Sequence, residues 1–226
     1  MPRLILMPLL LLPLTVSAGA AEPSRPIVVE LFTSQGCNSC PPADALLREL
    51  VQNRPDVLAL AFHVTYWNNL GWKDPYSLDA ATARQSSYNR ISGYGGNYTP
   101  QMVIDGKTDA VGSDRRAITA ALKSPPKQPL AVQVSRNGNT VTIDIPAGTG
   151  NGRILLVGYD PEHQTAIPRG ENAGKTLVEA NIVRDFLPIG TWTGTAIHLT
   201  HAIPTGERIA VLVQAADGQY LGAVRE

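Results

Sequence analysis

Two cysteines, Cys37 and Cys40, stand two residues apart and are the only cysteines among 226 residues. Thiols at this spacing form a redox-active disulfide or supply half of a zinc site. A tetrahedral zinc site needs about four ligands, whereas this chain offers four scattered histidines besides the pair. A disulfide across so short a loop restricts the unfolded chain less than a long-range disulfide does. The spacing therefore favours a redox-active disulfide over a structural zinc site or a disulfide that only stabilises the fold.

A strand and a helix are expected on either side of the cysteine pair. Residues 27–33 (IVVELFT) are β-branched and apolar, and apolar residues recur at helical spacing through 43–52. A helix that begins here would place the Cys37 thiol near free backbone N–H groups and the positive end of the helix dipole. Both lower the pKa of a thiol and raise its thiolate fraction. We expect Cys37 to face solvent as the attacking thiolate and Cys40 to be the resolving thiol.

Thr99-Pro100 is a second expected part of the site, because it precedes a short apolar run at 101–104 and an Asp-Gly turn. At these residues the chain resembles the thioredoxin superfamily, in which a threonine or similar residue precedes a cis-proline beside the Cys-x-x-Cys. The resemblance implies that Pro100 is cis and that Thr99 leaves a backbone edge for a substrate chain. Cis peptide bonds are essentially a proline phenomenon. The alternative is an ordinary trans-proline at the start of a strand.

Seven strings spread over nearly the whole chain carry a closer resemblance. They are ELFTSQGC at 30–37, CPPAD at 40–44, AFHVTYW at 61–67, LGWKDP at 70–75, YTPQM at 98–102, VGSDR at 111–115 and RGEN at 169–172. On these strings the chain resembles a family of exported bacterial thioredoxin-like proteins whose domain has no assigned function. The resemblance implies a thioredoxin-like fold and export, and no established substrate.

Two ionisable residues are candidates for a supporting role. Glu30 lies on the first expected strand, one residue out of register with a buried acid that assists the second cysteine in thioredoxins. An ordinary paired carboxylate is the alternative. His63 lies near the end of the second expected strand, 57–64, where it is placed to carry protons near the thiols. A hydrogen-bonded core histidine is the alternative.

Aromatic residues gather after the second expected strand. Tyr66, Trp67 and Trp72 are predicted to form an apolar rim that grips substrate chains. The alternative is that they cover an inserted helix expected at 77–91. The RGEN string at 169–172 is interpreted as a solvated loop, and the alternative is a loop that folds over the active site.

The pattern along the chain predicts an α/β thioredoxin-like domain followed by a small antiparallel β-sandwich-like domain. Residues 1–20 combine one arginine, a short apolar run and small residues, which is typical of a cleavable signal peptide. The thioredoxin-like domain is expected at 21–123 and a proline-rich linker at 124–129. Short strands with turn signals, including an Asn-Gly hairpin, follow over 130–226.

The composition and motifs together predict an exported thiol–disulfide oxidoreductase, periplasmic or secreted. Its expected partners are protein thiols or disulfides and a redox-recycling partner. With 19 basic and 19 acidic residues, charge does not indicate nucleic acid or an anionic membrane. No dinucleotide loop and no organic cofactor are expected. Two alternatives stay open: a copper(I) chaperone that uses both cysteines and His63, and a binding module whose disulfide is not catalytic.

Overall fold

The computed structural model describes residues 25–124 and 130–226. The predicted signal peptide at 1–20 lies outside the described residues, as does most of the predicted linker at 124–129. The helices are α1 (Pro41–Asn53), α2 (Asp79–Ser92) and α3 (Arg115–Ala121). The strands are β1 (Ile27–Thr33), β2 (Val57–His63), β3 (Gln101–Ile104), β4 (Thr108–Val111), β5 (Gln133–Asn137), β6 (Thr140–Ile145), β7 (Gly152–Ala166), β8 (Thr176–Trp192), β9 (Ile197–Ala202), β10 (Arg208–Gln214) and β11 (Tyr220–Arg225).

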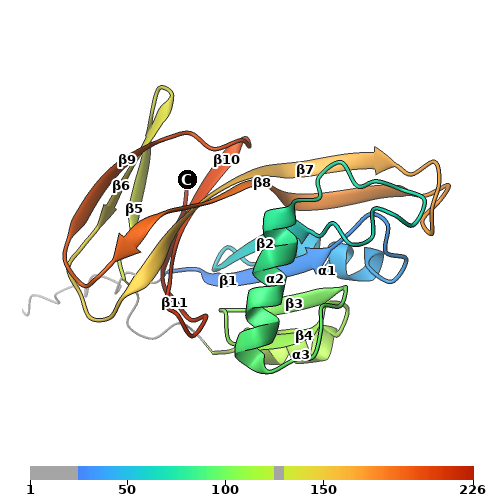
Figure 1. Ribbon diagram of the computed structural model, residues 1–226, viewed down its shortest axis with the longest axis horizontal. Helices are drawn as coiled ribbons and strands as arrows, with labels where there is room; N and C mark the ends of the chain where they lie inside the picture. Colours follow the sequence, from blue (N-terminus) through green and yellow to red (C-terminus); the bar gives the residue numbers. More distant parts are fainter. Residues whose placement is uncertain (1–24, 125–129) are drawn as a thin grey trace, which may run out of the picture.

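Most strands join one large mixed sheet. Its eight strands run in the order β11-β10-β7-β8-β2-β1-β3-β4, while β5, β6 and β9 form a second sheet of three strands. The fold is thus a mixed α/β arrangement with a large sheet and few helices (Figure 1). No helix among the described residues is long and apolar enough to cross a membrane.

The two central strands, β1 and β2, are buried along their whole length, because helices cover both of their faces. They pair in parallel through the crossover helix α1, and β3 lies antiparallel on the other side of β1. Alternate residues of β1 point to opposite faces. Val28 and Phe32 pack with residues of α2, whereas Val29 and Leu31 pack with residues of α1 and α3. The loop that carries both cysteines, residues 34–40, called here the disulfide loop, therefore starts from a fully buried strand.

Strands from beyond the predicted linker complete the same sheet. The long hairpin of β7 and β8 joins β2 through a parallel pairing of Ala61 with Ile182. Next to that point Asn181 has a positive φ of 48°, and its Nδ2 donates a 2.8 Å hydrogen bond to the Ala59 carbonyl. One half of the hairpin packs against β6 around Trp192, and the other half extends past α1 (Figure 1). The predicted all-β segment is therefore continuous with the sheet that carries the cysteines.

Candidate functional site

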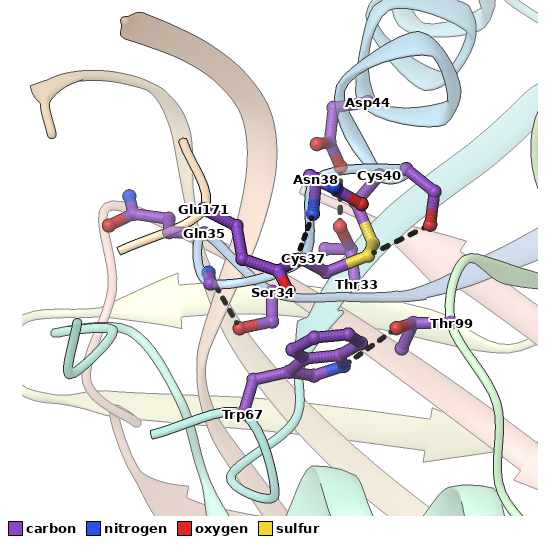
Figure 2. Close-up of a disulfide and its surroundings, with 12 residues drawn as sticks. Thr33, Ser34, Gln35, Cys37, Asn38, Cys40, Asp44, Trp67, Thr99 and Glu171 are labelled. Atoms are coloured by element: carbon purple, nitrogen blue, oxygen red, sulfur yellow. Dashed lines mark hydrogen bonds between the residues drawn. A yellow bond between two sulfur atoms is a disulfide. The ribbon is translucent and has the colours of Figure 1, made fainter. Parts of the chain in front are cut away.

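The two cysteines form a disulfide between β1 and α1, with their Cα atoms 5.4 Å apart (Figure 2). Both are 0% exposed, although Asn38 and Ser39 between them are exposed. The expectation that Cys37 faces solvent is therefore wrong for the disulfide form. Cys37 is covered because segments distant in sequence pack on the loop around it.

The amino terminus of α1 offers no free backbone donor to Cys37. Its first two residues, Pro41 and Pro42, have no N–H. The next two N–H groups, of Ala43 and Asp44, both donate to the Cys40 carbonyl, at 2.8 and 3.1 Å. Cys40 is the N-cap residue. The expected stabilisation of a Cys37 thiolate by free helix N–H groups is thus wrong, because prolines occupy the positions that would supply them.

Groups of the loop itself lie closer to Cys37. Its backbone N–H donates to the Ser34 carbonyl at 3.1 Å, and the Cys40 N–H donates to the Cys37 carbonyl at 3.3 Å. The Ser39 hydroxyl lies 3.3 Å from the Cys37 sulfur. The Ser39 hydroxyl is therefore positioned to donate to a thiolate at Cys37.

The loop between β7 and β8 covers the disulfide loop, which corrects its interpretation as a solvated loop. Asn172 is 0% exposed, and its Nδ2 donates to the carbonyls of Gln35 and Cys37, at 2.9 Å each. The adjacent Glu171 accepts a 3.3 Å hydrogen bond from the Asn38 N–H (Figure 2). Gly170 lies close to Gly71: a Cβ added to Gly71 would lie 3.3 Å from the Cα of Gly170. The β7–β8 hairpin thus supplies part of the site.

The Thr99–Pro100 peptide bond is cis, so that prediction is confirmed. The Thr99 hydroxyl accepts a 2.8 Å hydrogen bond from the Trp67 indole, which lies beside the disulfide loop (Figure 2). The Pro100 carbonyl accepts from the Gly112 N–H at 2.9 Å. A Cβ on Gly112 would lie 3.1 Å from Pro100 and 3.0 Å from Ala43. Pro100 is therefore close to the first turn of α1.

Each of the three aromatic residues predicted as a substrate rim donates a hydrogen bond to another part of the site. Tyr66 donates to Gln85 of α2 at 3.2 Å. Trp67 donates to Thr99, and Trp72 donates to the Gln35 side chain at 3.0 Å. Tyr66 stays 37% exposed. Their role in binding a substrate chain stays a prediction. The hydrogen bond from Trp72 to Gln35 ties the loop between β2 and α2, called here the aromatic loop, to the disulfide loop.

Glu30 is buried, but its carboxylate is held by other groups. It points to the face covered by α2, where Arg84 donates two hydrogen bonds to it, at 2.6 and 2.8 Å. The Tyr220 hydroxyl also donates to it. Both Glu30 and Arg84 are at most 7% exposed. This environment matches the ordinary paired carboxylate that was the alternative for Glu30.

A different set of buried ionisable groups lies behind the disulfide loop. The set consists of Asp44 of α1, His63 of β2, Asp74 of the aromatic loop and Glu179 of β8, all at most 6% exposed. His63 Nδ1 is 2.7 Å from Asp74, and its Nε2 is 3.8 Å from Glu179. Asp74 also accepts from the Gln35 N–H at 2.9 Å. We call these four residues the buried ionisable cluster.

Burial raises the pKa values of Asp44 and Glu179 in the buried ionisable cluster, and the charges of neighbouring members raise that of His63. For Asp74 the adjacent His63 and hydrogen bonds outweigh burial and lower the pKa. Burial and the nearby Glu179 raise the pKa of Asp44 to about 8. Burial also raises the pKa of Glu179. Burial alone would lower the pKa of His63, but Asp74 and Glu179 outweigh it and raise that pKa to about 9. At neutral pH His63 is charged, paired with ionised Asp74, while Asp44 keeps its proton and is hydrogen-bonded to Thr33 at 2.7 Å.

Most of the polar residues around the disulfide loop were not predicted as site residues from the sequence. Asp44, Asp74, Glu171 and Asn172 all lie within strings that carry the family resemblance, which was the available signal. Glu179 lies in a strand and had no such signal. Within residues 25–124 and 130–226, no group of three or more His, Cys, Asp or Glu side chains is arranged to hold a metal ion.

Comparisons with known proteins agree with this fold. No curated protein matches the sequence. The X-ray crystal structure of protein AGR_C_4864 from Agrobacterium tumefaciens is similar, with 33% identity and a TM-score of 0.76 over 91% of this chain and 95% of that one. HBP35 of Porphyromonas gingivalis shares the fold at 13% identity and a TM-score of 0.65, over 90% of this chain and 75% of that one. The family model for the protein of unknown function DUF1223 matches residues 28–214. The chain therefore belongs to the DUF1223 family.

Proposed function

We propose that this protein is a thiol–disulfide oxidoreductase that acts on protein cysteines through Cys37 and Cys40. The observation that carries the proposal is a short-loop disulfide between a buried strand and a helix whose buried acid, Asp44, donates its backbone N–H to the Cys40 carbonyl. A disulfide with a sequence separation of 3 stabilises a fold by about 2 kcal/mol, against about 4.7 kcal/mol for a 100-residue loop. Chemistry explains the pair better than stability does.

We also propose that residues 25–123 form a thioredoxin-like unit. Its elements follow the order β1-α1-β2-α2-β3-β4-α3. β1 and β2 are parallel, and β3 and β4 are antiparallel to their neighbours. The disulfide follows β1, and Pro100 precedes β3. These features support the resemblance on which the proposal draws.

In the proposed reaction, a substrate thiolate attacks the Cys37 sulfur and a new S–S bond forms between them. The Cys37–Cys40 bond breaks, and the Cys40 sulfur leaves with the electron pair and takes up a proton. Asp44 is the buried group assigned to supply that proton, because it follows Cys40 by four residues on the same helix face. In the reverse direction Asp44 accepts the proton of Cys40, which then resolves the mixed disulfide.

Export to the periplasm or the outside of the cell remains part of the proposal. It is supported by the composition of residues 1–20 and by a disulfide, which persists mainly in oxidising compartments. The proposed partners are exported proteins with thiols or disulfides and a redox partner that recycles the pair. The copper(I) and binding-module alternatives have no specific observation in their favour.

Exchange with a model peptide disulfide tests the proposal. The reduced protein is expected to reduce the peptide faster than an equal concentration of free cysteine at the same pH, and Cys37→Ser is expected to abolish this activity. Cys40→Ser is expected to accumulate a mixed disulfide at Cys37, detected by mass spectrometry. Activity no greater than that of free cysteine, or a mixed disulfide formed at Cys40 in the Cys37→Ser variant, would overturn the proposed roles.

A further inference from the structure

We propose that Glu171, on the tip of the β7–β8 hairpin, selects by charge which thiols reach Cys37. The inference deepens the proposed function, since it rests on Cys37 being the attacked sulfur. The hairpin tip is defined here as residues 167–175, between the two strands. Glu171 disfavours the attack of anionic thiols on Cys37, and Asn172 holds the hairpin tip in place.

The hairpin tip is built to stay against the disulfide loop. Ile167 at its start is 2% exposed and forms hydrogen bonds with Lys175 and Gly174, at 2.9 and 2.8 Å. Asn172 is fully buried between the tip and the loop, where both protons of its Nδ2 are used by loop carbonyls. Its Oδ1 accepts from Lys175 at 2.9 Å. The side chain of Asn172 therefore connects the hairpin tip to the disulfide loop by hydrogen bonds, although the two segments are far apart in sequence.

Because Asn172 is held in this way, the carboxylate of the adjacent Glu171 accepts a hydrogen bond from the backbone N–H of the residue after Cys37. That N–H, of Asn38, is 3.3 Å from Glu171 Oε2 (Figure 2). It would otherwise be a donor for negative charge at Cys37. The helix N–H groups are absent or already used, as described above for the first turn of α1. Glu171 thus takes one of the few donors near Cys37 and adds a negative charge beside it.

Other charges on the hairpin tip do not occupy this position. Arg169 and Lys175 are exposed, and the hydrogen bond described for Lys175 goes to Asn172. Glu171 is the charged tip residue with a described hydrogen bond to the backbone between the two cysteines. Replacing it by glutamine removes one negative charge and keeps the size of the side chain. The Glu171→Gln variant therefore tests the negative charge of Glu171 while the hairpin tip still covers the disulfide loop.

The reaction that probes this selection is reduction of the disulfide by small thiols. A thiolate forms a bond to the Cys37 sulfur while the Cys37–Cys40 bond breaks and Cys40 leaves as a thiolate. A second thiolate then attacks the mixed disulfide, releasing the small disulfide and the Cys37 thiolate. In water-like surroundings a unit charge about 10 Å away changes the rate about twofold. The anionic and cationic thiols differ by two unit charges, so removing one charged group changes their rate ratio about fourfold, and salt screens the effect.

The experiment compares three thiols on the intact oxidised protein: anionic 2-mercaptoethanesulfonate, neutral 2-mercaptoethanol and cationic cysteamine. Rates are followed by acid quenching, alkylation and mass spectrometry, and are corrected for the thiolate fraction of each reagent. In Glu171→Gln, the rate ratio of the anionic to the cationic thiol is expected to rise about three- to fivefold at low salt. The rise is expected to shrink at high salt.

Glu162→Gln is the matched control, because Glu162 is an exposed residue of the same hairpin. It pairs with Ala180, four residues below the last pair, Ala166 with Thr176, and thus about 13 Å down the ladder. This exceeds the Debye length of about 10 Å at about 0.1 M salt, so the two variants are compared with each other at about 0.1 M salt. Its rate ratio is expected to equal that of the unchanged protein. An unchanged ratio in Glu171→Gln, or an equal rise in both variants, would overturn the role of Glu171.

Asn172→Ala tests whether Asn172 holds the hairpin tip against the disulfide loop. It is expected to increase the rate of the neutral thiol, because it frees the hairpin tip, and to raise the rate ratio of the anionic to the cationic thiol, because Glu171 is then no longer held beside Cys37. Unchanged rates would overturn the role of Asn172. Small thiols reduce any reachable disulfide, so this experiment does not depend on activity towards proteins. A shifted ratio together with no peptide exchange would refute the proposed function and leave the selection by Glu171 in place.

Discussion

Replacing Asp44 by asparagine is expected to change how the stability of the oxidised protein depends on pH. Asp44 is 6% exposed, and its carboxylate accepts a hydrogen bond from Thr33 at 2.7 Å. Burial and Glu179 raise its pKa from 3.8 to about 8. In the unfolded chain the same carboxyl group is ionised above its ordinary pKa. Asparagine has nearly the same shape, can accept from Thr33 and does not ionise.

The sign of the effect follows from proton binding. Between pH 3.8 and about 8 the folded protein keeps a proton on Asp44 that the unfolded chain has released, so the free energy of unfolding falls as pH rises. The slope is about 1.4 kcal/mol per pH unit for one such group. From pH 5 to pH 8 the unchanged protein is therefore expected to lose up to about 4 kcal/mol relative to Asp44→Asn.

Urea denaturation of both oxidised proteins at pH 5, 6, 7 and 8 measures this difference. Asp44→Asn is expected to gain stability relative to the unchanged protein at each step, with the other members of the buried ionisable cluster present in both. Asp109→Asn, which changes a half-buried carboxylate on β4, serves as the control for general charge effects. A stability difference that stays constant from pH 5 to pH 8 would refute the reasoning that Asp44 is protonated in the folded protein.

Further predictions concern packing and the paired carboxylate. Arg84→Met is expected to lower the free energy of unfolding by about 3 to 5 kcal/mol, because it leaves Glu30 buried without its ion pair. Adding Glu30→Leu should recover much of the loss in urea denaturation, and no recovery would contradict this account. Gly112→Ala is expected to cost about 1 to 3 kcal/mol, since its Cβ would lie 2.9 to 3.1 Å from three buried neighbours. Gly95→Ala is the control, because its Cβ would meet nothing within 4 Å, and an equal loss in both would argue against a packing clash.

Local sequence patterns were sufficient to predict the elements that carry the cysteines. The uninterrupted apolar runs predicted β1 and β2, and helical spacing predicted α1 within two residues of each of its ends. These patterns succeed because burial of a strand or a helix face is set by neighbouring residues. Cys37, Cys40 and the cis bond at Pro100 were likewise predictable from short strings.

The surroundings of the disulfide depended on tertiary structure. The side of β1 to which Glu30 points, and its pairing with Arg84, follow from how α2 packs on the sheet. Glu171 and Asn172 reach the disulfide loop because the β7–β8 hairpin extends past α1, 133 and 135 residues from the backbone groups they contact. Strand pairing and loop packing over such separations depend on the whole fold. The sequence by itself thus determined the cysteine pair, the strand and helix that hold it and the proline before β3. The tertiary structure decided which distant groups cover the disulfide loop and place charge beside it.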